Sequence, residues 1–101
     1  YNIYPREIED VLRKHPAIDD IAVIGEASEE WGETVVAYAV ASEPLNIEAL
    51  RQSIGDQLAS FKHPRALHII DALPRNALGK VQKHRLQDGK VLPNQHLLNS
   101  A

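Results

Sequence analysis

The sequence predicts a small α+β domain in which helices pack on a short three-stranded sheet. Apolar residues recur with helical spacing in two segments, and they form three short runs rich in β-branched residues. Proline or glycine separates most of these segments, as is typical of turns. The chain has 101 residues, of which 44% are hydrophobic and 25% are charged. This length and composition are typical of one globular domain with a single modest core.

The first half of the chain is predicted to form a helix and two strands. The helix begins at Pro5, a residue that is favoured in the first helical turn, and ends before Pro16. Its apolar stripe consists of Ile8, Val11 and Leu12. The runs 20–25 and 34–41 are almost continuously apolar, so we expect strands that are buried on both faces. The acidic segment 26–33 between them is expected to be an exposed turn.

A second helix is predicted from Asn46, whose side chain can cap it, to about Ser60. Gly55 inside this helix costs about 1 kcal/mol relative to alanine. We therefore expect the helix to depend on tertiary packing. A basic connector, 61–65, leads to the third predicted strand at 66–70.

The C-terminal part is predicted to contain little regular structure. Residues 81–87 are expected to form one or two helical turns, which Gly89 ends. The residues from Lys90 onward have no periodicity, and we expect a loosely held end. The predicted division is therefore a domain over 1–88 and a tail over 89–101.

The stretch 73–80, LPRNALGK, has the most distinctive chemistry of the chain. Pro74 fixes φ and Gly79 permits positive φ, so a sharp turn is expected to present Lys80 to solvent. A lysine at a loop tip is suited to meeting phosphate or carboxylate oxygens. Between residues 62 and 85, six bases stand against the single acid Asp71, although the whole chain has a net charge of −3. The bases are Lys62, Arg65, Arg75, Lys80, Lys83 and Arg85. This local excess of positive charge favours the binding of an anionic ligand. The alternative is a solvated turn with scattered surface lysines.

This stretch is not a P-loop. It lacks the first glycine of the pattern GxxxxGK, and Val81 stands where the magnesium-binding hydroxyl would be. The adjacent acids Asp19–Asp20 and Glu29–Glu30 are typical of a solvated face, and the five histidines lack the spacing of metal ligands. We expect no metal site within this chain.

Composition argues against several classes of protein. The chain has no cysteine, which excludes disulfides and fits a reducing cytosol, so a cytoplasmic location is expected. The net acidity argues against nucleic-acid binding. No apolar run approaches the roughly 20 residues that span a membrane. The lack of methionine and the abrupt start at Tyr1 are typical of a piece of a longer protein.

Four blocks of the sequence resemble, in the right order, the C-terminal domain of the adenylate-forming enzymes. This superfamily includes acyl- and aryl-CoA synthetases, peptide-synthetase adenylation domains and firefly luciferase. The blocks are YNIYPREIE at 1–9, VIGEASEEWGETVVAYAV at 23–40, LASFKHPR at 58–65 and LPRNALGK at 73–80. The last block, a P-x4-G-K loop, is the most specific, and the FKHPR stretch is most similar to CoA ligases.

The resemblance implies a two-step reaction that this domain shares with a large N-terminal adenylation domain. A small carboxylic acid attacks the α-phosphate of ATP, and CoA then takes the acyl group from acyl-AMP. It implies that Lys80 is the catalytic cation of the first step, in a substrate loop that includes Pro74, Arg75 and Gly79. Mg²⁺ is expected to accompany ATP in the N-terminal domain, and this chain alone is expected to be inactive.

The resemblance also implies a CoA-binding surface. In the related chlorobenzoate CoA ligases, the positions that match Trp31, Phe61, His63 and Arg65 lie against the CoA nucleotide. His63 departs from the basic residue expected at its position. Phe61 has an alternative role as the last apolar residue of the second predicted helix. The alternative functions are an adenylation domain that serves a carrier protein and a stand-alone module that binds an anion or a partner.

Overall fold

The computed structural model describes residues 3–30 and 32–94 of the chain. The N-terminal part consists of α1 (Pro5–Leu12), β1 (Ile18–Ser28), β2 (Gly32–Ala41), α2 (Ile47–Ile54) and β3 (Ala66–Ile69). The C-terminal part adds the two-residue strands β4 (Leu86–Gln87) and β5 (Lys90–Val91). Three short 3-10 turns lie at Gly55–Gln57, Ser60–Lys62 and Lys83–Arg85. The predicted α+β class with a three-stranded sheet is confirmed.

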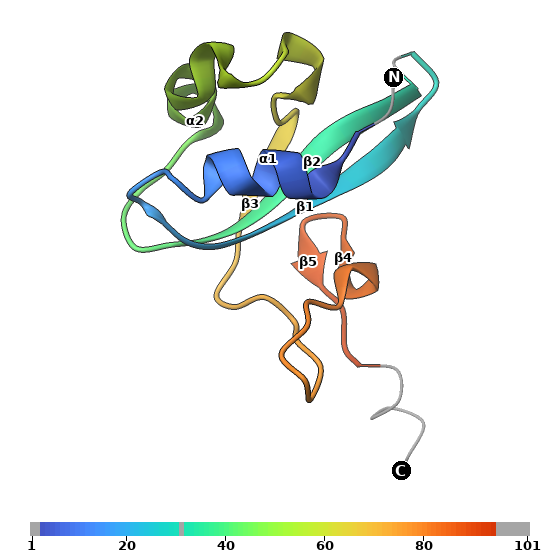
Figure 1. Ribbon diagram of the computed structural model, residues 1–101. Helices are drawn as coiled ribbons and strands as arrows, with labels where there is room; N and C mark the ends of the chain where they lie inside the picture. The colour runs from blue at the N-terminus through green and yellow to red at the C-terminus, as the bar shows by residue number, and fades with distance from the viewer. Residues whose placement is uncertain (1–2, 31, 95–101) are drawn as a thin grey trace.

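The sheet has the order β1-β2-β3. The long strands β1 and β2 are antiparallel, and β3 runs parallel to β2 with Val36 opposite Ala66. Figure 1 shows α1 crossing in front of this sheet, with α2 beside it. The parallel pairing is possible because α2 and the 3-10 turns Gly55–Gln57 and Ser60–Lys62 carry the chain back toward the end of the sheet at which β2 begins.

Both faces of the central strands are buried, as their continuous apolar runs predict. On one face, Val23, Val35 and Ala37 pack with residues of α1 and α2. On the other face, Ala22, Val36 and Tyr38 pack with Leu73 and Leu86 of the C-terminal segment. The segment from residue 70 onward therefore forms a third layer on the sheet. This is the layer that carries the Lys80 loop.

The prediction that the second helix continues to Ser60 is wrong. Asn46 does cap it, because its side chain accepts a hydrogen bond from the backbone N–H of Ala49 at 2.8 Å. The helix ends at Ile54, however, since Gly55 adopts a φ of 52° and leaves the helical region. Leu58 still reaches the core, where it is 5% exposed, but from an irregular segment.

The helix expected at 81–87 is also wrong. After a single 3-10 turn, β4 and β5 form a small antiparallel hairpin. Its turn residues, Asp88 and Gly89, have φ values of 52° and 76°. An Asp-Gly pair with two positive φ angles is the favoured two-residue hairpin turn. Gly89 thus turns a hairpin instead of ending a helix, and Lys90–Val91, expected in a loose end, are paired with β4.

The acidic turn between the first two strands is shorter than expected, since β1 extends to Ser28 and β2 starts at Gly32. In the part of the chain that the structure describes, no helix is long and apolar enough to cross a membrane.

Candidate functional site

The predicted substrate loop is a narrow hairpin with Lys80 beside its tip. Arg75 and Val81 face each other across an antiparallel bridge. Asn76 N donates to Lys80 O at 2.9 Å, and Gly79 N donates to Asn76 O at 2.9 Å. Gly79 has a φ of 85°, so the predicted positive φ is confirmed. These features describe a turn with Asn at its first position and a left-handed glycine at its fourth.

Asn76 organises this turn, although its role was not predicted from the sequence. Its side-chain Oδ1 accepts hydrogen bonds from the backbone N–H groups of Leu78, at 2.9 Å, and Lys80, at 3.0 Å. The detectable signal was the spacing of Asn and Gly, which is typical of such turns. With the backbone fixed in this way, the base of the Lys80 side chain has a defined position.

Arg75 braces the same hairpin. Its Nη1 donates to the carbonyl oxygen of Gly79 at 2.6 Å, and its Nη2 pairs with Asp20 Oδ2 at 2.8 Å. On the opposite strand of the hairpin, Gln82 N donates to the carbonyl oxygen of Pro74 at 2.8 Å. The substrate-loop residues Pro74, Arg75, Gly79 and Lys80 are thus brought together in one hydrogen-bonded unit.

The basic cluster predicted around the loop is largely compensated in space. At least three of its six bases form ion pairs with acids from the N-terminal part of the chain. The pairs are Lys62–Glu7, Arg75–Asp20 and Lys83–Glu9. Lys80 is exposed, and its ammonium group has no ion-pair or hydrogen-bond partner among residues 3–30 and 32–94. Within the hairpin, Lys80 therefore offers an uncompensated positive charge.

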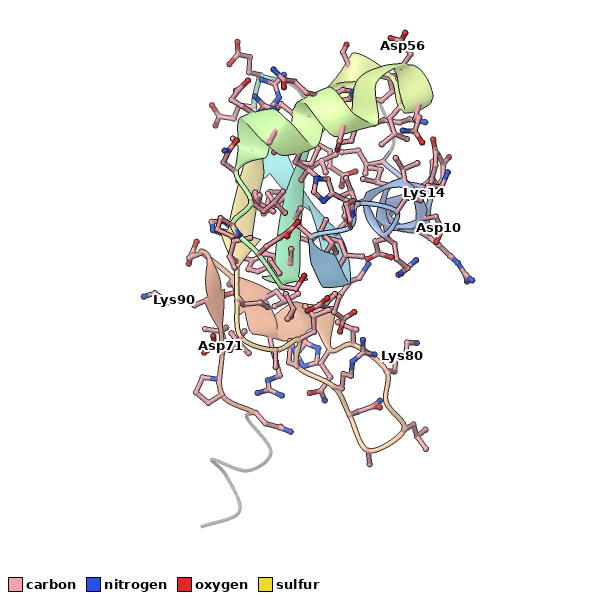
Figure 2. All side chains as sticks on the ribbon, turned by 90° about the vertical axis from the view of Figure 1, so that its left-hand side faces the viewer. Asp10, Lys14, Asp56, Asp71, Lys80 and Lys90 are labelled. Carbon is pink, nitrogen blue, oxygen red and sulfur yellow. The ribbon has the colours of Figure 1, made fainter. Side chains whose placement is uncertain are left out.

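An open groove of about 730 Å³ runs beside Lys80. It is bounded by α1, by the start of β1 and by the Lys80 hairpin. Its polar lining includes Glu9, Arg13, Asp20, Asn76, Lys80 and His84. The Glu9 carboxylate is only 13% exposed, and its Oε2 accepts the backbone N–H of Val23 at 2.8 Å and pairs with Lys83 at 2.9 Å. Figure 2 shows Lys80 on the side of the molecule that carries Asp10 and Lys14, and at the opposite end from Asp56.

Three of the residues predicted to bind CoA lie elsewhere in the structure. Phe61 lies in the 3-10 turn Ser60–Lys62, His63 and Arg65 lie between that turn and β3, and Trp31 lies outside the described residues. Figure 1 shows the yellow part of the chain, around residue 60, near α2, whereas the orange Lys80 hairpin projects at the other end of the domain. The structure therefore does not bring the 61–65 segment and the Lys80 hairpin together.

His63 is held by the backbone. Its Nε2 lies 3.1 Å from the carbonyl oxygen of Gly55 and 3.2 Å from that of Leu58. Both partners are acceptors, so this network assigns the proton to Nε2 and leaves Nδ1 for another partner. The backbone N–H of Arg65 donates to Val35 O at 2.8 Å, and Phe61 is half-buried. The segment is therefore a fixed platform attached to β2.

Comparison with known proteins identifies the family. The model of the AMP-binding enzyme C-terminal domain matches residues 7–80, which is more than half of the chain. The chain belongs to this family. This match confirms the resemblance inferred from the four sequence blocks.

Relatives of this C-terminal domain include named CoA ligases. It is 44% identical over 85 residues to the 2-succinylbenzoate–CoA ligase of Bacillus licheniformis, covering 84% of this chain and 18% of the ligase. It is 40% identical over 88 residues to the 4-chlorobenzoate–CoA ligase of an Arthrobacter species, covering 86% of this chain and 17% of that protein. The chain thus spans less than a fifth of the length of these relatives.

A solved structure has the same fold. The Bacillus subtilis o-succinylbenzoate CoA synthetase in complex with its acyl-adenylate intermediate matches with a TM-score of 0.83 and 35% identity. The match covers 93% of this chain and 19% of the synthetase.

Proposed function

We propose that this chain is the mobile C-terminal domain of an ATP-dependent acyl-CoA ligase, with residues 1–88 as the lid over an N-terminal adenylation domain. The whole reaction converts a carboxylic acid, ATP and CoA into acyl-CoA, AMP and pyrophosphate. The observation that carries the proposal is Lys80, whose ammonium group has no ion-pair partner among the described residues and which a braced hairpin presents beside an open groove. Family membership and the named CoA ligases among the relatives support the same reaction class.

Lys80 serves the first half-reaction. A carboxylate oxygen of the acid attacks the α-phosphorus of ATP, an acyl–phosphate bond forms, and pyrophosphate leaves. Two anions must approach each other, so a cation that contacts the carboxylate and the bridging oxygen lowers their repulsion. A preorganised electrostatic donor of this kind contributes about 3–4 kcal/mol to transition-state stabilisation, or roughly 10²–10³ in rate.

The second half-reaction uses a different part of the domain. The CoA thiol attacks the acyl carbon and AMP leaves, so Lys80 has no equivalent charge to stabilise. In this proposal Trp31 or Phe61 stacks on the adenine of CoA and Arg65 pairs with a phosphate, while His63 accepts a hydrogen bond from the nucleotide at Nδ1. The separation of the 61–65 segment from the Lys80 hairpin supports this division, since a rotating lid presents one end of itself at a time.

Mg²⁺ belongs with ATP in the N-terminal domain in this proposal. Among the described residues, no group of three or more acidic or histidine side chains is placed to hold a metal ion. In this proposal the contribution of this chain to ATP binding is the cationic hairpin, and the residues that coordinate the metal belong to the N-terminal domain.

The test compares Lys80→Ala with the intact wild-type ligase. ATP–pyrophosphate exchange reports the first half-reaction, and thioester formation from supplied acyl-AMP reports the second. Exchange is expected to fall 10²–10³-fold while thioester formation is largely retained. Lys90→Ala is the matched control, because Lys90 is an exposed lysine on β5. Equal losses in both half-reactions would refute the role of Lys80. No loss in either would make Lys80 a surface lysine and favour the binding-module alternative.

A further inference from the structure

Arg75 was assigned to the substrate loop, yet both of its terminal nitrogens already have partners within the domain. Nη1 donates to the Gly79 carbonyl oxygen at 2.6 Å. Nη2 donates to Asp20 Oδ2 at 2.8 Å, and this link joins residues 55 positions apart. The guanidinium group thus lies between the turn that precedes Lys80 and a strand of the central sheet.

Asp20 is itself fixed at both of its carboxylate oxygens. Oδ1 accepts the backbone N–H of Ile21 at 3.0 Å, while Oδ2 holds Arg75. Its backbone lies in β1, where it pairs with Val40 of β2. A continuous series of contacts therefore runs from the rigid sheet through Asp20 and Arg75 to the carbonyl group of Gly79, one peptide before Lys80.

Within the described part of the chain, a second ion pair lies on the exit side of the hairpin. Lys83 pairs with Glu9 of α1 at 2.9 Å. That contact lies beyond the turn, whereas the Asp20–Arg75 contact reaches the turn itself through Gly79. Of the two ion pairs, Asp20–Arg75 is the one that constrains the direction in which Lys80 projects.

We propose that Asp20 and Arg75 are positioning residues that aim Lys80 during adenylate formation, and that Arg75 is not a ligand of ATP. This inference rests on the proposed function of Lys80 for its kinetic consequence, whereas the structural link is independent of it. The arginine and aspartate side chains are 43% and 32% exposed, so their pairing contributes little to folding stability. A misplaced catalytic group, in contrast, can reduce the rate by about 10²-fold for a shift of only about 1 Å.

The first experiment measures kcat and the KM for ATP in ATP–pyrophosphate exchange by the intact ligase. Asp20→Asn and Arg75→Lys are each expected to lower kcat about 10-fold to 100-fold and to leave the KM for ATP unchanged. The double variant is expected to be no slower than the slower single variant, because both substitutions break the same link. Asp20→Glu keeps the charge and is expected to retain most of the rate.

Glu7→Gln is the matched control. It removes the Glu7–Lys62 ion pair, which also joins residues 55 positions apart but has no contact with the hairpin. Its kcat for exchange is expected to equal that of the wild type. Thioester formation from supplied acyl-AMP is expected to be unchanged in the Asp20 and Arg75 variants.

Two kinetic results would overturn the proposal. One is an increased KM for ATP in Arg75→Lys that Asp20→Asn does not share, which would make Arg75 an ATP ligand. The other is an unchanged kcat in both single variants of an enzyme that Lys80→Ala inactivates. If Lys80→Ala leaves ATP–pyrophosphate exchange intact, the proposed function fails. Amide hydrogen exchange of the peptide 74–82 in the intact protein then tests the structural link by itself. Faster hydrogen exchange in Asp20→Asn but not in Glu7→Gln would support the link, and equal hydrogen-exchange rates in Asp20→Asn and wild type would overturn it.

Discussion

The hydroxyl oxygen of Tyr38 accepts a hydrogen bond from the backbone N–H of Gly89 at 3.0 Å. Tyr38 lies in the middle of β2 and is fully buried, while Gly89 forms the turn of the β4–β5 hairpin. The ring of His68, from β3, lies beside both residues, with its centroid 5.0 Å from that of Tyr38. This contact is one of the points at which the C-terminal layer is joined to the central sheet.

Removing the Tyr38 hydroxyl is expected to destabilise the domain. Tyr38→Phe keeps the packed ring but leaves the Gly89 N–H without its acceptor, so the free energy of unfolding should fall by about 1–2 kcal/mol. Urea denaturation of the chain measures this change. Tyr4→Phe is the control, because Tyr4 is 61% exposed, and it should have no effect. Equal stabilities of Tyr38→Phe and wild type would show that the hydrogen bond contributes nothing.

The two hairpin glycines are expected to differ in their tolerance of alanine. Gly79 and Gly89 both have positive φ, at 85° and 76°, so each substitution carries backbone strain of about 1–3 kcal/mol. A Cβ on Gly79 would meet nothing within 4 Å, whereas one on Gly89 would lie 2.8 Å from His68 Nδ1. Gly89→Ala should therefore cost more free energy of unfolding than Gly79→Ala, as measured by urea denaturation.

A His68→Ala background provides the control for this comparison. With the imidazole removed, the difference between the two glycine substitutions should shrink toward zero. A difference that persists would mean that a contact other than His68 distinguishes the two turns.

Glu9 is expected to be a stability residue within the groove. Glu9→Ala removes the acceptor of the Val23 N–H and the partner of Lys83 at a carboxylate that is 13% exposed, so a loss of about 2–3 kcal/mol is expected. Asp10→Ala removes the exposed Asp10–Arg13 pair on the same helix and should change stability by less than about 0.5 kcal/mol. Thermal or urea unfolding of both variants checks the contrast, which similar losses would contradict.

Substitution of Arg65 is expected to weaken the binding of CoA without affecting the reaction with ATP. Arg65→Ala should raise the KM for CoA about tenfold in the intact ligase, because the guanidinium pairs with phosphate in the proposed complex, and ATP–pyrophosphate exchange should not change. Arg6→Ala, at an exposed position on α1, is the control. An unchanged KM for CoA in Arg65→Ala would reject this residue as part of the CoA surface.

The sequence predicted those parts of the fold that depend on local pattern. The apolar runs identified the two long strands and their burial on both faces, and Pro5 located the start of α1. Gly79 was predicted to adopt positive φ because a tight turn requires it there. Each of these features is set by residues close together in the chain.

Features that depend on tertiary contacts were missed. A glycine at position 55 is compatible both with a continuing helix and with the end of a helix. In the structure Gly55 has positive φ and the helix ends before it. The Asp88–Gly89 pair was a detectable hairpin signal, but its two strands are so short that they depend on the packing of Leu86 against the sheet and on the hydrogen bond to Tyr38. Likewise, the compensation of the basic cluster by Glu7, Glu9 and Asp20 joins residues far apart in sequence.

The burial of the sheet on both faces has a consequence for shortened forms of this protein. The C-terminal layer is not an appendage, since its Leu73 and Leu86 cover Ala22, Val36 and Tyr38. A chain that stops at residue 70 would expose this apolar sheet face to water. Such a face favours self-association. Deletion of the Lys80 hairpin together with its layer would therefore produce an aggregating protein, and inactivity of that protein would say nothing about catalysis.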